Sequence, residues 1–479
     1  MPSPQQIVNR DKLNPHHTRS TKAALIPTPT QSPAPATDQQ SKLPFPTLGQ
    51  PAFLVLVILI ALAIRFAVVA LVFRDVAAPT LDHNEFGWEM GWTARSIALG
   101  QGFSSPFLPI SGPTALVPPI YPYLLAGVFR LFGIYSPLSA FVILSFNSLL
   151  SALTAIPIYF AVKQTLSPRL ARFAACAWAL YPFSIYYAAD RVWDYALTVF
   201  LFSCCFWLLQ SLHRRGLAAW LGFGVLYGVT ALSNPSILSL LPFFLIFATV
   251  QGWKANRRTF LNGLVAALAV IAVCAPWMIR NGRALHTSPT MRSGFWLEFY
   301  AGNNGDSFES NIAWVHPANN PVEMQKYIAM GEIAYMDRAK ALSIDFVQHH
   351  PGWVAFATVR RIVRFWTSFW SLNARYLAKE PTDIPNFFFC TALTLLMLRG
   401  LRRWGRIDRA AVIPYWLALA IFPIPYYLTH ASPDYRQPIE PIIAILVTVG
   451  IFGISKNLVP TIGRTERSPV RHEVPPAQR

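Results

Sequence analysis

The chain has 479 residues, of which 53% are hydrophobic and only 13% are charged. Soluble proteins carry about 25% charged residues, so the composition excludes a soluble enzyme and indicates an integral membrane protein. Lys and Arg total 40 against 22 acids, a formal net charge of +18. Most of this surplus lies in short runs between apolar segments and no nucleic-acid-binding motif accompanies it, so it predicts membrane orientation and no nucleic-acid partner.

Residues 1–50 are polar and rich in Pro, Ser, Thr and Gln, which predicts a disordered tail. Beyond them, apolar segments recur at the length that a helix needs to cross a bilayer. We expect about ten spans in an all-α polytopic fold. The segments are Pro51–Phe73, Pro137–Val162, Leu170–Ala188, Trp193–Leu212, Leu217–Leu232, Ser236–Gly252, Phe260–Ile279, Phe387–Leu398, Ala411–Thr429 and Ile439–Ile454.

The short loops between these segments alternate in charge, which predicts their orientation. Basic residues concentrate in every second loop: Lys163, Arg169 and Arg172; His213, Arg214 and Arg215; Lys254, Arg257 and Arg258; Arg399, Arg402, Arg403, Arg406 and Arg409. Basic loops stay in the cytoplasm. Both termini are therefore expected in the cytoplasm, and the chain is expected to cross the membrane several times.

Two long segments then lie on the exterior side. The first, residues 74–136, includes a short apolar piece, Pro118–Phe132, expected to re-enter the membrane or lie at its interface. The second, residues 281–386, is too long for a simple loop and has helical composition. After Pro351 it offers one apolar helical face opposite Arg360, Arg361 and Arg364. Such a helix suits a bilayer surface, although the face could equally pack on a neighbouring domain.

The expected organisation follows from these boundaries. A cytoplasmic tail, residues 1–50, precedes an N-terminal transmembrane module at 51–280 that contains the first exterior loop at 74–136. A small helical exterior domain occupies 281–386. C-terminal transmembrane helices occupy 387–456, and a second cytoplasmic tail occupies 457–479.

The first exterior loop groups three carboxylates, Asp82, Glu85 and Glu89, at the edge of the bilayer. Ionisable groups at that depth are costly and tend to mark a site. A helix starting near Asn84 would place Glu85 and Glu89 on one face. Asp82 and Glu85 also have the spacing of a capping box, in which Asp82 would only cap the helix. The two roles are compatible.

Several motifs give the chain a family resemblance. They are Ala94-Arg95-Ser96, Gly100-Gln101-Gly102-Phe103-Ser104, Pro113-Thr114-Ala115, Pro118-Pro119-Ile120-Tyr121-Pro122, Asn234-Pro235, Pro276-Trp277-Met278-Ile279-Arg280-Asn281, Gly302-Asn303-Asn304 and Tyr435-Arg436-Gln437-Pro438-Ile439-Glu440-Pro441. Together with the first-loop acids, they resemble membrane-embedded glycosyltransferases of the C-type fold. The likeness is to bacterial family-39-like enzymes related to protein O-mannosyltransferases and lipid A aminoarabinose transferases. Protein O-mannosyltransferases carry adjacent Asp-Glu here, whereas His83-Asn84 separates Asp82 from Glu85.

The resemblance implies a bacterial inner (plasma) membrane as the location of this multi-pass protein. It also implies a donor sugar on a polyprenyl phosphate and a lipid, glycan or protein acceptor on the exterior face. Asp82 is the first choice for the catalytic base, with Glu85 and Glu89 next. The acceptor would attack opposite the leaving phosphate, with inversion. Arginine suits oxyanions because its fork binds them bidentately. The outward-facing candidates for donor phosphate binding are Arg95, Arg191, Arg280 and Arg436.

Other charged residues have simpler interpretations. Arg436 could instead snorkel at a helix end. Asp190 and Asp194 are expected to be solvated loop charges or helix N-terminal acids. Arg65, inside the first span, is expected to pair with an acid or face the bundle interior. No His or Cys has metal-ligand spacing, so no metal site or cofactor is expected, although the sequence leaves divalent-ion assistance open.

The principal alternative function is a polytopic lipid or sugar transporter, or flippase, without transferase chemistry. Intramembrane charges would support it, but no repeat relates the two halves of the chain. A related undecaprenyl-diphosphate-sugar transferase and a non-catalytic membrane scaffold are further alternatives. A nucleotide-sugar enzyme is disfavoured because the chain has no Asp-x-Asp pair and no Gly-rich phosphate loop.

Overall fold

A computed structural model describes residues 48–76, 86–108, 110–253, 256–288, 290–305 and 315–454. Contacts divide the chain after Leu48 into two units, and the described helices belong to the second unit, Gly49–Arg479. Both predicted cytoplasmic tails lie almost wholly outside the described residues.

The described residues of this unit are organised as helices. The first half contains α1 (Gln50–Val76), α2 (Trp88–Ala98), α3 (Ile120–Phe132), α4 (Pro137–Leu153), α5 (Ala155–Thr165), α6 (Pro168–Ala179), α7 (Pro182–Ala189), α8 (Tyr195–Leu212), α9 (Leu217–Ser233), the 3-10 helix η2 (Pro235–Leu240) and α10 (Leu241–Trp253). The second half contains α11 (Thr259–Leu285), α12 (Phe295–Gly302), α13 (Pro321–Met330), α14 (Glu332–His349), α15 (Pro351–Thr367), α16 (Ala374–Lys379), α17 (Asp383–Gly405), α18 (Arg409–Ile421), α19 (Ile424–Leu428), η5 (Pro433–Ile439) and α20 (Glu440–Phe452).

Eight helical stretches among the described residues are long and apolar enough to cross a membrane. They are Gln50–Phe73, Pro137–Thr165, Tyr195–Leu212, Pro235–Trp253, Thr259–Leu285, Asp383–Gly405, Arg409–Leu428 and Pro433–Phe452. The other two predicted spans are helical but shorter: α9, and the stretch Leu170–Ala188, which is divided between α6 and α7. The prediction of an all-α, multi-pass membrane protein is confirmed.

The break between α6 and α7 explains the charge inside the first span. Pro182 opens α7 and cannot donate a backbone hydrogen bond, so the helix cannot continue through it. Arg65 reaches the break with its side chain fully buried. It donates to the Ala179 carbonyl at 3.2 Å and to the Ser184 hydroxyl at 2.8 Å, and its Nε donates to Ser151 at 3.0 Å. Arg65 therefore faces the bundle interior, one of the two predicted placements, and satisfies polar groups that the break exposes.

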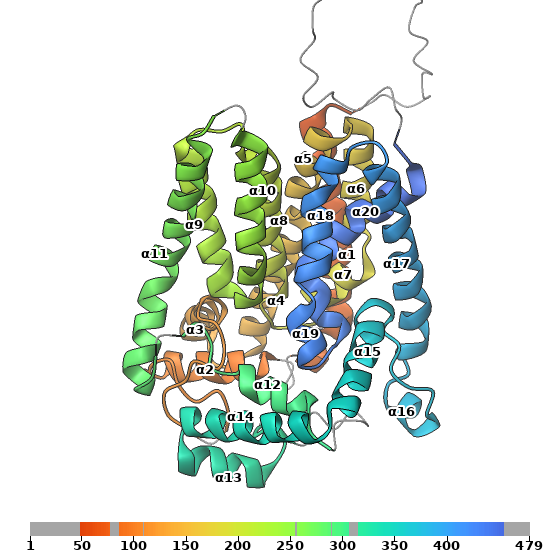
Figure 1. The fold of residues 1–479 in the computed structure, drawn as a ribbon. Helices are drawn as coiled ribbons and strands as arrows, with labels where there is room; N and C mark the ends of the chain where they lie inside the picture. Colours follow the sequence, from red (N-terminus) through yellow and green to blue (C-terminus); the bar gives the residue numbers. More distant parts are fainter. Residues whose placement is uncertain are drawn as a thin grey trace, which may run out of the picture. The chain divides into compact units, whose positions relative to one another are not determined.

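Short helices gather at one end of the spanning bundle. Figure 1 shows α2, α3, α12, α13 and α14 at the lower end, opposite the end where α17 meets α18. α15 is amphipathic, as predicted: Phe356 and Val359 are more than half exposed, whereas Arg361 on the opposite face is buried. Arg361 donates to the Leu428 carbonyl at 3.1 Å, which fastens α15 to α19. The exposed apolar face is then available to a bilayer surface.

α17 and α20 pack closely because glycines occur where the two helices cross. A Cβ on Gly400 would lie 1.9 Å from the Leu446 carbonyl oxygen, and one on Gly450 would lie 2.2 Å from that of Leu396. Small residues of this kind allow helix backbones to approach in a membrane.

Gly400→Ala should therefore destabilise the protein by about 1–3 kcal/mol, because the added methyl group forces the helices apart. Gly222 in α9 is the matched control, since nothing lies within 4 Å of its Cβ position. Gly222→Ala should leave stability unchanged or raise it slightly through helix propensity. Thermal unfolding of both variants in detergent measures the difference, and equal melting temperatures would contradict the packing argument.

Orientation in the membrane is a separate prediction. Gln348 near the end of α14 and Arg406 after α17 are both exposed, and the charge alternation places them on opposite sides. With cysteine introduced at either position in intact cells, a membrane-impermeant thiol reagent should label position 348 and not position 406. The reverse pattern would invert the topology.

Candidate active site

The first-loop helix α2 holds Glu89 against residues 281–386, the predicted exterior domain. The helix begins at Trp88, later than the expected start near Asn84, and its N-cap is Gly87 with a φ of 92°. A Cβ on Gly87 would lie 2.5 Å from the Val192 carbonyl oxygen, so this turn requires glycine for both conformation and space. Asp82, the predicted helix cap, lies outside the described residues. Glu89 itself is only 8% exposed.

A buried carboxylate, Glu332, ties the first loop to the exterior domain. It accepts hydrogen bonds from the Thr114 hydroxyl at 2.5 Å and the Ala115 amide at 2.8 Å. It also accepts from the Ser293 hydroxyl and the Tyr327 hydroxyl, both at 2.7 Å. Loop residues and exterior helices thus share one polar anchor. An apolar cluster encloses it, formed by Trp92, Phe107, Leu116, Leu297, Met324, Tyr327, Tyr335 and Met336.

Two carboxylate–imidazole contacts lie in this region. Glu298 on α12 is 2.6 Å from Nε2 of His430. Oε1 of Glu89 is 3.4 Å from Nε2 of His316. The His316 ring is stacked against Trp88, with ring centroids 5.9 Å apart and planes 10° apart. Residues from α2, α12, the segment before α13 and the segment after α19 are therefore brought together.

Arg292 is the cation that these acids share. Its Nη2 is 3.2 Å from Glu298, and its Nε donates to the Leu116 carbonyl in the first loop. Its positive charge also acts on Glu89 and on Asp194, at the start of α8. The side chain remains 39% exposed. Arg292 therefore keeps access to solvent while it is electrostatically coupled to several acids.

The environment drives the two glutamates apart in pKa. Burial, with a smaller contribution from the charge of Glu298, raises the pKa of Glu89 to about 7. Burial also opposes ionisation of Glu298, but His430, Arg292 and His316 outweigh it and lower its pKa to about 2. Burial lowers the pKa of His316 to about 4, so at neutral pH this ring is uncharged and its contact with Glu89 is not an ion pair. When the pKa values of two neighbouring carboxyl groups differ in this way, the group with the raised pKa can exchange a proton while the other stays charged. Here these are Glu89 and Glu298, respectively.

Two further acids border this group. Asp194 is 2% exposed and accepts a hydrogen bond from Thr198 at 2.8 Å. Burial raises its pKa to about 6. Asp194 is the N-terminal acid of α8, as expected, but it is not a solvated loop charge. Asp434 accepts from the Tyr195 hydroxyl at 2.7 Å, and its negative charge acts on Tyr435.

The residues predicted to form the site differ in their burial and in their partners. Glu89 lies among these buried charged groups, whereas Asp82 and Glu85 lie outside the described residues. Arg95 is half-buried on α2. Arg191 is 3.2 Å from Asp190 and donates to the Tyr186 hydroxyl at 2.8 Å.

The remaining two predicted cations, Arg280 and Arg436, form hydrogen bonds within the protein. Arg280 donates to the Thr114 and Phe103 carbonyls, both at 2.6 Å, which holds the first loop against α11. Arg436 is 1% exposed; its Nε donates to Glu440, and Nη1 lies 3.3 Å from the Phe365 carbonyl. Their binding to a donor phosphate stays a prediction.

Four residues of this group were not singled out from the sequence as site residues: Arg292, Glu298, His316 and His430. Glu298 had a sequence signal, because it is the single acid in the aromatic run Phe295-Trp296-Leu297-Glu298-Phe299-Tyr300. The histidines had none, since their partners are far away along the chain. In the part of the chain that the structure describes, no group of three His, Cys, Asp or Glu side chains is arranged to hold a metal ion.

Comparison with known protein families gives a match to one part of the chain. Residues 116–279 match the family model described as dolichyl-phosphate-mannose-protein mannosyltransferase. The match covers 164 of the 479 residues. A comparison with curated proteins gave no match.

Solved structures give the fold. One is the archaeal oligosaccharyltransferase AglB from Archaeoglobus fulgidus in complex with an inhibitory peptide and a dolichol-phosphate, at 13% identity and a TM-score of 0.50, over 84% of this chain and 50% of that chain. The apo form of the Archaeoglobus fulgidus oligosaccharyltransferase matches at 14% identity and the same TM-score, over 83% and 50%. The chain thus spans about half the length of these structures.

A third structure is ArnT from Cupriavidus metallidurans bound to undecaprenyl phosphate, at 16% identity and a TM-score of 0.47, over 85% of this chain and 61% of that chain. The predicted C-type glycosyltransferase fold is confirmed by the oligosaccharyltransferase matches.

Proposed function

We propose that this protein transfers a sugar from a polyprenyl-phosphate donor to a hydroxyl or amine of a lipid, glycan or protein acceptor on the exterior face of the membrane. Two comparisons support the donor class: the matched family is described by its dolichyl-phosphate-mannose donor, and the AglB structure contains a dolichol-phosphate. The buried acids and Arg292 at the exterior end of the bundle provide groups suited to this chemistry. Metal assistance is not part of the proposal.

The observation that carries the proposal is the placement of Glu89, which is buried on α2, 3.4 Å from His316 and in the same group as Glu298 and Arg292. Burial there raises its pKa to about 7, whereas the pKa of Glu298 is lowered to about 2. A general base works best when its pKa lies near the operating pH. Glu89 would accept the acceptor's proton as the acceptor oxygen or nitrogen bonds to the anomeric carbon. Asp82, the first choice from the sequence, and Glu85 follow α1 in the same loop and are tested beside it.

Arg292 would receive the leaving group. As the anomeric carbon–oxygen bond breaks, its electron pair goes to the polyprenyl phosphate, whose oxygens gain negative charge. A guanidinium offers two parallel donors to such oxygens. The Leu116 carbonyl and Glu298 fix the orientation of Arg292, so little reorganisation is needed when the phosphate forms. Attack opposite this phosphate inverts the anomeric centre.

Glu89→Gln should lower kcat by about 10²–10⁴-fold, the usual contribution of a positioned base. Because glutamine keeps the size of the side chain, folding should be retained. A transfer assay with a panel of polyprenyl-phosphate sugars on purified protein measures the effect, with Asp82→Asn and Glu85→Gln assayed in parallel.

Glu380→Gln, at an exposed position after α16, is the matched control and should retain full activity. If Glu89→Gln is fully active and Asp82→Asn is inactive, the base is Asp82. Full activity in all three first-loop variants would remove the proposed chemistry from this loop.

The pH dependence follows from the same group. Because a base acts only when deprotonated, kcat/KM should rise with pH, reach half of its maximum near pH 7 and level off above that, in line with the raised pKa of Glu89. The profile is measured with saturating acceptor and limiting donor. A kcat/KM that falls as pH rises toward 7 would exclude Glu89 as the base.

Arg292→Lys keeps the charge but loses the two-donor fork, so we expect at least a tenfold rise in donor KM, about 1.4 kcal/mol. Arg436→Lys tests the sequence-based assignment by the same measurement. A raised donor KM in Arg436→Lys alone, with intact thermal stability, would place the phosphate at Arg436 instead. Acceptor KM serves as the internal control.

A further inference from the structure

The last turns of α17 carry a basic groove at the end of the bundle away from the candidate active site. It is lined by Leu395, Leu398, Arg399, Arg402, Arg403 and Arg406. These positions follow helical spacing, so the groove runs along one side of one helix. Its volume of about 460 Å³ lies within the range of small-ligand sites.

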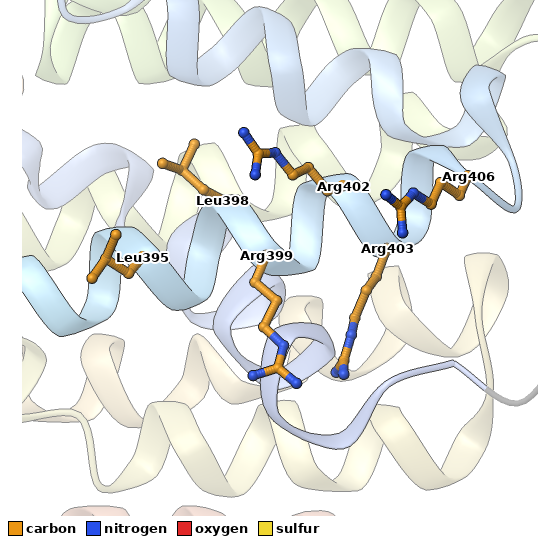
Figure 2. Close-up of a pocket in the computed structure, with 6 residues that line it drawn as sticks. All are labelled: Leu395, Leu398, Arg399, Arg402, Arg403 and Arg406. Atoms are coloured by element: carbon orange, nitrogen blue, oxygen red, sulfur yellow. The ribbon is translucent and has the colours of Figure 1, made fainter.

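The groove changes character along its length. Leu395 and Leu398 are 63% and 42% exposed and lie on the membrane-spanning part of α17. Four guanidinium groups follow toward the helix end. Figure 2 shows Arg399 and Arg403 extending toward one edge of this face, while Leu398 and Arg402 extend toward the other edge. An apolar surface therefore leads directly into a concentration of positive charge.

The groove is partly ordered by the fold. Nη1 of Arg403 donates to the Gly450 carbonyl at 2.7 Å, which ties it to the last turn of α20. Arg399, Arg402 and Arg406 are exposed. Within the described residues, no carboxylate lies within ion-pair distance of these three. The nearby acid Asp408 instead accepts the amide of Ala411 at the start of α18.

General orientation rules explain only part of this arrangement. Cytoplasmic loops need positive charge, and cations near a helix C-terminus interact favourably with its dipole. Neither effect requires four arginines around one groove or exposed leucines leading into it. A ligand with an anionic group and an apolar chain would match both parts of the groove, the arginines and the leucines.

We propose that this groove binds an anionic phospholipid of the leaflet opposite the candidate active site. The lipid phosphate would contact Arg399, Arg402 and Arg406, and an acyl chain would lie along Leu395 and Leu398. Basic pockets at this level of a membrane protein are suited to anionic headgroups. Figure 1 places this end of α17 away from α2, α12 and α14, so the site is separate from the proposed chemistry.

The test is lipid binding to the purified full-length protein, measured by native mass spectrometry in a neutral detergent. The probes are phosphatidylglycerol, phosphatidylcholine and glycerol phosphate. The groove variant is Arg399→Gln/Arg402→Gln/Arg406→Gln, which retains the structural hydrogen bond of Arg403. The control is Arg214→Gln/Arg257→Gln/Arg258→Gln, which removes the same charge from exposed positions in other predicted cytoplasmic loops.

The wild-type protein and the control should bind phosphatidylglycerol at least about tenfold more tightly than the groove variant, since each lost cation weakens attraction to an anionic headgroup. Phosphatidylcholine should bind all three proteins equally weakly. Equal phosphatidylglycerol binding by groove variant and control would overturn the proposal. Glycerol phosphate binding as tightly as the lipid would assign the groove to a soluble phosphate instead.

Leu395→Ser provides a second measurement. It removes apolar contact while leaving all four guanidinium groups in place, so phosphatidylglycerol binding should weaken. Unchanged lipid binding in this variant would show that no acyl chain lies along the groove, which would also overturn the proposal.

Discussion

The structure depends on the requirement that polar groups removed from water find partners inside the protein. Within the spanning region, one unsatisfied backbone group costs several kcal/mol. Arg65 shows how the requirement is met: its guanidinium satisfies the Ala179 carbonyl where Pro182 interrupts the helix. At the same break, buried Arg436 donates to Glu440, which also accepts from the Tyr181 hydroxyl. These buried charges therefore stabilise the break between α6 and α7.

The same requirement connects the first loop to the exterior domain. Glu332 can remain buried because four donors from separate segments converge on it. Those segments in turn carry Arg292 and the loop that comes after Glu89. Displacing Glu332 would leave its carboxylate without partners, at the high cost of an unpaired buried charge. The position of the candidate site is thus linked to the packing of the exterior domain.

Desolvation then gives the site its chemical asymmetry. Glu89 and Glu298 are the same residue type in one neighbourhood and each contacts an imidazole, but Glu298 lies closer to its histidine and also contacts the guanidinium of Arg292. Burial without such compensation raises the pKa of Glu89, whereas the partners of Glu298 lower its own. Charge is distributed differently at the far end of α17, where exposed arginines border apolar side chains and remain in contact with solvent.

The sequence by itself determined that this is a membrane protein and where most of its helices lie. It also indicated the first loop as the place of a candidate site. Those features depend on local composition: apolar runs of spanning length, proline breaks, and acids at a membrane edge. It also indicated the amphipathic face of α15, because helical periodicity is local. Tertiary structure decided which charged groups meet. His316 and His430 gained significance only when folding brought them to Glu89 and Glu298 across large separations in the chain. Arg436 shows the converse, since its place at a helix start suggested access to a phosphate and packing buried it beside Glu440. Pairing across distant segments depends on the three-dimensional path of the chain, which no local pattern encodes.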